Sequence, residues 1–80
     1  MTTEELNLIR EVGFIYSIKS KLLEKESDDG FHKDYLILKD DNFYIERELY
    51  LQEDDGTFYT DFCKILPDDG ITLTEFLTDY

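Results

Sequence analysis

Residues 42–60, NFYIERELYLQEDDGTFYT, contain the clearest folding signal in this 80-residue sequence. Two runs rich in Phe, Tyr, Ile and Leu flank the turn sequence Asp54-Asp55-Gly56. An Asp-Gly turn between alternating apolar and polar residues is a strong indication of a β-hairpin. We therefore expect strands at Phe43–Gln52 and Phe58–Leu66, and we expect the rest of the chain to be arranged around them.

Short helices are expected at both ends of the sequence. Thr2 with Glu5, and Thr72 with Glu75, have the spacing of a capping box, in which the cap and the third helical residue bond to each other's backbone. Gly13 can end the first helix in a left-handed conformation. The last ten residues, ITLTEFLTDY, also allow a strand, but their apolar spacing of three and four residues favours the helix.

Two strands are expected between the first helix and the hairpin. From Phe14 apolar and polar residues alternate, and the alternation breaks at Ser20–Leu23, which indicates a bulge. The continuous apolar run Tyr35–Leu38 is typical of a central strand covered on both faces. The expected fold is α+β: a short N-terminal helix, a four-stranded antiparallel β-meander and a short C-terminal helix, in one domain of residues 1–80.

The turns assign side chains to the two faces of the sheet. A two-residue type I′ turn at Asp55-Gly56 would place Leu49 opposite Phe62. A turn at Asp41-Asn42 would place Leu38 opposite Ile45. The expected core face then consists of Leu36, Leu38, Ile45, Leu49, Leu51 and Phe62.

Two basic residues fit this face assignment poorly. Arg47 and Lys64 fall on the expected core face, so they either extend their charges past its edge or indicate an error of register. The opposite face would carry tyrosines interleaved with carboxylates, where stiff contact area combines with long-range attraction for basic groups. Its members are Tyr44, Glu46, Glu48 and Tyr50 from one strand and Tyr59, Asp61 and Cys63 from the next.

The charge balance restricts the partners that the chain can have. There are 20 Asp and Glu against 8 Lys and Arg, a formal net charge of −12, and the excess is spread along the whole sequence. Such a surface repels phosphate backbones and anionic lipids and attracts basic proteins. We therefore expect no direct binding of nucleic acid or membrane.

The sequence contains no motif for catalysis, a cofactor or a metal. His32 and Cys63 are the only residues of their kinds, and no local pattern joins them into a nucleophile pair. The Asp-Asp-Gly turns lack the spacing of a calcium-binding loop. The lack of these motifs predicts a non-enzymatic protein. A single thiol and an N-terminus without an apolar signal region favour a cytoplasmic location.

These features predict a binding surface for a basic protein, and a nucleic-acid-binding enzyme is the partner expected first. Carboxylates would lie where phosphates otherwise bind, and tyrosines would supply packing. The expected partner-binding residues are Tyr44, Glu46, Glu48, Tyr50, Asp54, Asp55, Tyr59 and Asp61.

In size, charge and absence of catalytic residues the chain is similar to the small acidic inhibitors of bacteriophages, although no motif is shared. These include DNA-mimicking anti-restriction proteins, uracil-DNA glycosylase inhibitors and several anti-CRISPR proteins. The resemblance implies an inhibitor that occupies a nucleic-acid-binding site. Three alternatives remain open: an immunity or antitoxin-like protein against a basic toxin, a structural protein that forms homodimers or larger homo-oligomers, and a small enzyme. The tyrosine-bearing face can also be an ordinary solvated sheet face, or one that the second helix covers.

Overall fold

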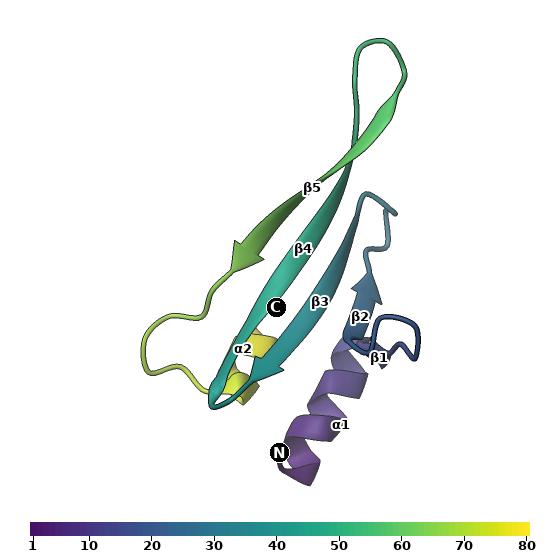
Figure 1. Cartoon of the computed structure of the whole chain (residues 1–80). Helices are drawn as coiled ribbons and strands as arrows, with labels where there is room; N and C mark the ends of the chain where they lie inside the picture. The colour runs from purple at the N-terminus through teal and green to yellow at the C-terminus, as the bar shows by residue number, and fades with distance from the viewer.

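The computed structural model describes residues 1–80. Its elements are α1 (Thr3–Val12), β1 (Ile15–Tyr16), β2 (Leu23–Glu26), β3 (His32–Lys39), β4 (Asn42–Gln52), β5 (Phe58–Ile65) and α2 (Leu73–Thr78). The strands form one antiparallel sheet in the order β1-β2-β3-β4-β5, and α2 crosses behind β3 and β4 (Figure 1). The α+β meander is confirmed, whereas the expected number of four strands is wrong.

The fifth strand arises where a bulge was expected. The chain reverses direction between β1 and β2, so that Ile15 pairs with Glu24 and Tyr16 with Leu23. Lys21 has a φ of 61°, in the left-handed region that a tight turn uses. The break in alternation therefore marks a turn, and the expected single strand is two short ones.

Both expected helices form with the expected caps. The Thr2 hydroxyl accepts the N–H of Glu5 at 3.1 Å, and the Glu5 carboxylate accepts the N–H of Thr2 at 2.9 Å. Thr72 and Glu75 repeat this arrangement at the start of α2. Gly13 ends α1 with a φ of 111°, as its sequence position predicts.

The loop between β4 and β5 consists of Asp54, Asp55 and Gly56, because Glu53 and Thr57 are bonded to each other. This three-residue loop corrects the expected register. Gln52 pairs with Phe58, and the N–H of Gly56 donates to the carbonyl of Glu53 at 3.0 Å. Gly56 has a φ of 91°, as in a type I turn followed by a residue with positive φ. One additional loop residue shifts the pairing by one position, and such a shift moves every β5 side chain to the other face.

The turn between β3 and β4 also differs from the expected one, but this difference moves no side chain to the other face of the sheet. Lys39 pairs with Asn42, so the turn residues are Asp40 and Asp41, and Leu38 lies opposite Phe43. The pairing moves by two positions, which keeps each side chain on its expected face. The strand β3 is central, but only one of its faces is covered by helices, since Leu36 is buried while its neighbours are partly exposed.

The core lies between the sheet and the two helices. Leu36 and Ile45 contribute from the sheet, as expected, whereas Leu38 is 38% exposed and Phe62 lies on the opposite face. Leu49 and Leu51 are only partly buried because the helices do not reach that end of the sheet. The buried apolar residues are Ile9, Phe14, Leu36, Ile45, Leu73 and Leu77.

A buried carboxylate lies beside this core on the helix-covered face. Asp34 has no exposed surface, and its two oxygens accept hydrogen bonds from Nε and Nη2 of Arg47 at 2.7 and 2.9 Å. The hydroxyl of Tyr80 also donates to Asp34. The Tyr80 ring packs against Phe14, and the Lys25 ammonium lies 4.7 Å from its centroid. Arg47 thus lies on the core face, as expected, and its ion pair with Asp34 explains how a charged side chain is accommodated there.

We expect Arg47→Met to lower the free energy of unfolding by about 3–5 kcal/mol, because it leaves the Asp34 carboxylate buried without a countercharge. Urea unfolding followed by circular dichroism measures this. The double variant Asp34→Leu with Arg47→Met removes both charges and should recover most of the loss. A single variant as stable as the parent protein would contradict the role assigned to the pair.

Asp34 also makes stability depend on pH. Burial alone would raise its pKa, but the hydrogen bonds from Arg47 and Tyr80 outweigh burial and hold the pKa below its usual value. A lowered folded-state pKa gives stability that is complete above about pH 4 and is lost as pH falls through the folded-state value. We therefore expect the stability difference between the parent and Asp34→Asn to be constant at neutral pH and to narrow below about pH 4. A difference that widens on acidification would contradict this.

Candidate binding surface

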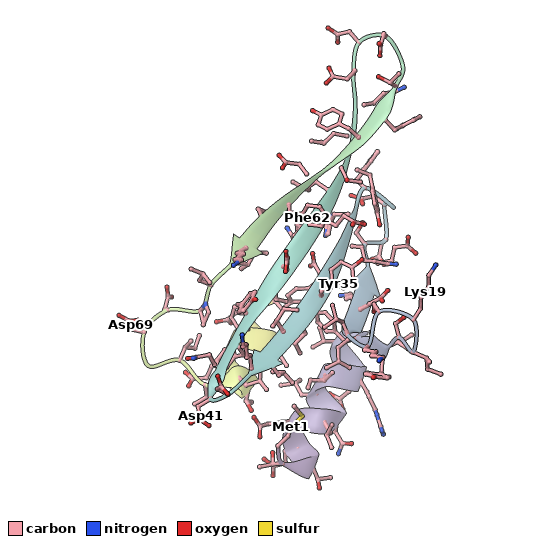
Figure 2. All side chains as sticks on the ribbon, viewed as in Figure 1. Met1, Lys19, Tyr35, Asp41, Phe62 and Asp69 are labelled. Atoms are coloured by element: carbon pink, nitrogen blue, oxygen red, sulfur yellow. The ribbon has the colours of Figure 1, made fainter.

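The face of the sheet opposite the helices is open, and the expected β4 residues lie together on it. Tyr44, Glu46, Glu48 and Tyr50 alternate with the core-facing residues of β4 and are all partly buried. Figure 2 looks onto this open face, with Tyr35 of β3 and Phe62 of β5 on either side of β4. The chain's own helices therefore leave this face uncovered.

The carboxylates of the open face are largely offset by lysines. Glu46 pairs across the strands with Lys64, whose ammonium lies 5.3 Å from the centroid of the Tyr44 ring. Glu48 pairs with Lys33, and the Lys33 ammonium binds the Glu24 carboxylate at 3.0 Å. The open face therefore offers aromatic contact area but little net negative charge. Lys64, which fitted the expected core face poorly, indicated an error of register.

Tyr50 illustrates the environment of this face. Partial burial and the neighbouring Glu48 carboxylate raise the pKa of the Tyr50 phenol to about 12. Burial and Glu48 raise the pKa of Tyr35 as well. Both phenols remain neutral at physiological pH, so they act as hydrogen-bond donors and apolar contacts.

The expected β5 residues do not join this face. Tyr59, Asp61 and Cys63 lie on the helix-covered side, because the three-residue loop shifts the register by one position. In their place the open face carries Phe58 and Phe62, which are 78% and 55% exposed. Sequence reasoning missed both phenylalanines as surface residues. The unfavourable core position of Lys64 was the signal that could have revealed them.

The hairpin projects beyond the rest of the sheet as an arm, defined here as residues 49–62. The strand β3 begins at His32, which pairs with Leu49, so β4 and β5 continue without a neighbour past Tyr50 (Figure 1). The radius of gyration is 14.0 Å, against about 12 Å expected for a compact chain of this length. The longest dimension is 47 Å. The arm makes the molecule elongated.

Negative charge on the hairpin arm is not balanced by any basic residue within the arm. The arm carries four acids and no Lys or Arg: Glu53, Asp54, Asp55 and Asp61. Three of these lie at the tip, where oxygen-bearing side chains gather in Figure 2. Exposed Phe58 and Tyr59 follow directly after the tip. The arm therefore combines unbalanced negative charge with exposed aromatic rings.

The two aspartates of the tip have different roles. The Asp55 carboxylate accepts the N–H and the hydroxyl of Thr57, at 2.9 and 2.6 Å. Both bonds hold the pKa of Asp55 below its usual value, and the bond from the Thr57 hydroxyl has the larger effect. The Asp54 side chain is exposed and makes no hydrogen bond within the chain. Asp55 thus holds the loop, whereas Asp54 and Glu53 are available to a partner.

The structure separates the two residues considered for a nucleophile pair. His32 is on β3 and Cys63 on β5, so the whole of β4 lies between them, a distance of about 10 Å across the sheet. The His32 imidazole lies 3.9 Å from Asp34, whose oxygens are already held by Arg47 and Tyr80. These contacts position side chains within the fold and bring no nucleophile to the histidine.

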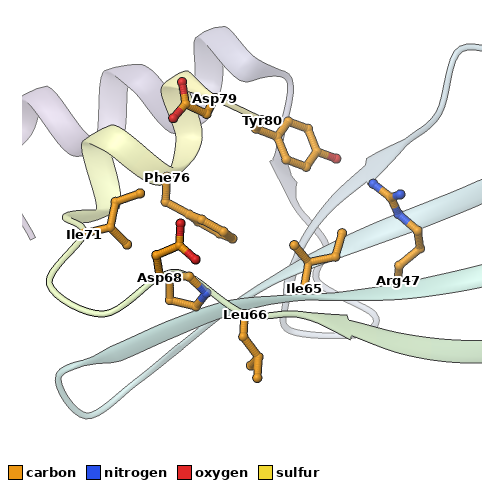
Figure 3. A pocket seen from close by; sticks show the side chains of 9 residues that line it. Arg47, Ile65, Leu66, Asp68, Ile71, Phe76, Asp79 and Tyr80 are labelled. Carbon is orange, nitrogen blue, oxygen red and sulfur yellow. The ribbon is translucent and has the colours of Figure 1, made fainter.

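A hollow of about 330 Å³ lies between α2 and the end of β5 (Figure 3). Ile65, Ile71 and Phe76 form its apolar walls, and Arg47 lies at its edge. Because Nε and Nη2 of Arg47 are bound to Asp34, the guanidinium charge is compensated. The hollow fits an apolar side chain better than an anion.

Comparison with protein-family models, curated proteins and solved structures found no match to this chain.

The different roles of the tip aspartates can be tested by paired substitutions. Asp55→Ala should lower the free energy of unfolding, because two hydrogen bonds that fix the loop are lost. Asp54→Ala removes the same charge from the neighbouring position and should leave stability nearly unchanged. Thermal unfolding of the two variants measures the difference. Equal effects would contradict the assignment.

Proposed function

We propose that this protein is a non-enzymatic acidic binding module that inserts its hairpin arm into a basic surface of another protein. The observation that carries the proposal is the arm itself: four carboxylates, no basic side chain and exposed aromatic rings on an element that projects from the fold. A projecting hairpin can enter a groove that a flat sheet face cannot.

The charge distribution favours the arm over the open face as the part that attracts the partner. On the open face, Glu46 and Glu48 lie next to Lys64 and Lys33. On the arm, no Lys or Arg lies between Glu48 and Phe62. Uncompensated charge at the end of an elongated molecule steers encounter with an opposite charge over a distance set by ionic strength. Tyr44 and Tyr50 then extend the contact along the open face.

The basic partner surface is, in this proposal, one that otherwise binds nucleic acid. Proteins that bind DNA or RNA carry Lys and Arg arranged to neutralise phosphates, and this is a common source of a strongly basic groove. Carboxylates at the arm tip occupy phosphate positions, while Phe58 and Tyr59 can pack where bases stack. The protein then acts as an inhibitor by occupying the nucleic-acid site.

Competition tests this function. The tagged protein is used to isolate its partner from a host lysate, and the purified complex is then titrated with duplex DNA, single-stranded DNA and RNA. We expect at least one nucleic acid to displace the partner, and we expect complex formation to weaken as salt increases. A complex that no nucleic acid displaces would exclude occupation of a nucleic-acid site.

Variants that remove equal numbers of charges identify the part of the chain that attracts the partner. Glu53→Gln with Asp54→Asn should slow association about tenfold at low salt, because these uncompensated charges meet the partner first. Glu11→Gln with Asp69→Asn removes the same number of charges from α1 and from the loop before α2, and should change the rate little. Stopped-flow or surface-based kinetics measure both.

A third variant compares the open face with the arm. Glu46→Gln with Glu48→Gln should slow association less than the tip variant, since Lys64 and Lys33 lie opposite these carboxylates on the neighbouring strands. If the open-face variant were the more damaging one, the arm would not be the element that steers binding.

A further inference from the structure

The two edges of the sheet differ in how much backbone they leave unpaired. One edge is β1, which has only two residues. The other is β5, which has eight and no strand beyond it. A long uncovered edge strand is a template for another strand, because its outward N–H and C=O groups lack partners.

The hydrogen-bond pattern identifies which β5 groups point outward. The N–H of Glu53 donates to the carbonyl of Thr57 at 2.8 Å, so this pair bonds across β4 and β5. Antiparallel pairs alternate between bonded and non-bonded, and the register is continuous from here to Ile65. The odd-numbered β5 residues therefore bond to β4. The outward groups belong to Phe58, Thr60, Phe62 and Lys64.

One of these outward groups is covered by a charged side chain. The Asp61 carboxylate accepts the N–H of Phe62 at 2.9 Å. Asp61 is exposed and lies on the opposite face from Phe62. A basic side chain that binds this carboxylate would release the Phe62 amide for pairing.

We propose that the β5 edge receives an extended basic segment of the partner protein as a sixth strand of the sheet. This inference rests on the proposed function and specifies how the partner binds. In the added strand, apolar side chains lie beside Phe58 and Phe62 on the open face, and Lys or Arg lies beside Asp61 on the other. The required segment alternates apolar and basic residues, and it runs along the acidic arm.

The same geometry disfavours a second copy of this chain on the edge. In a two-fold antiparallel pairing of β5 with itself, each residue meets one on its own face, so Asp61 meets Tyr59, Asp61, Cys63 or Ile65 of the other copy. None of these is basic. Lys64, the one base on β5, lies on the opposite face from Asp61. The net charge of −12 on each copy adds repulsion.

Amide hydrogen exchange tests this pairing directly. The probe is the blocked heptapeptide Lys-Val-Lys-Val-Lys-Val-Lys, added in excess to the ¹⁵N-labelled protein at low salt. We expect exchange at Phe58, Thr60, Phe62 and Lys64 to slow by about tenfold or more, while the odd-numbered β5 amides, already paired with β4, change little. The corresponding Glu-Val peptide should give no protection.

Thr60→Pro provides the matching variant. It removes an outward N–H and no bond to β4, so the hairpin should persist while the added strand binds about tenfold or more weakly. Thr60→Val keeps the N–H and should bind as the parent does. Spectra of both free variants report whether the fold is intact, and the exchange measurement on the parent decides the question if Thr60→Pro does not fold.

The outcomes separate this inference from the proposed function. Peptide binding without protection of the outward amides, equal binding by Thr60→Pro and the parent, or no binding of the Lys-Val peptide would each overturn strand addition. Protection that appears without peptide as protein concentration rises would show a second copy on the edge and also overturn it. None of these results bears on whether nucleic acid displaces a captured partner, which is the test of the function.

Discussion

The structure depends on compensation of one buried carboxylate. Asp34 has no exposed surface, and an isolated buried charge costs several kcal/mol, a large part of the 5–15 kcal/mol typical of a whole domain. Arg47 supplies the countercharge from the adjacent strand, and both residues must lie on the helix-covered face in direct register. Tyr80 adds a third bond from the residues that follow α2. One polar group thus couples the register of β3 and β4 to the closure of the helix over the core.

The sequence predicted those features that depend on neighbouring residues. Both capping boxes and the Gly13 stop require residue types at fixed short spacings, and all of them form. The reversal between β1 and β2 was harder to predict. A bulge and a tight turn both interrupt the alternation of apolar and polar residues, and only the pairing of β2 with β3 distinguishes them. The Asp34 pair was also missed. Arg47 stood out as a misplaced charge, but its partner lies on another strand and has no local signature.

The sequence predicted the faces of β4 correctly and those of β5 wrongly, and one loop residue explains the difference. The β4 faces follow from the burial of Ile45, whatever the turn. The β5 faces depend on whether the Asp-Asp-Gly sequence contributes two or three residues to the loop. An Asp-Gly pair is compatible with a hairpin loop of either length. Lys64 favoured three, since that register places its ammonium near Tyr44 and Glu46 instead of in the core. Misplaced charges on a proposed core face are therefore evidence about loop length.

The arm is separate from the forces that hold the fold together. None of the buried apolar residues comes from residues 49–62, and α1 and α2 both lie at the end of the sheet away from the arm. The arm persists through its backbone ladder and its loop bonds, which require Asp55, Gly56 and Thr57 but neither Asp54 nor Phe58. The Phe58 ring gains little burial there, and clustered carboxylates repel each other. These side chains therefore stabilise the isolated molecule only slightly or not at all, and in the proposed function their burial and charge become favourable on contact with a partner.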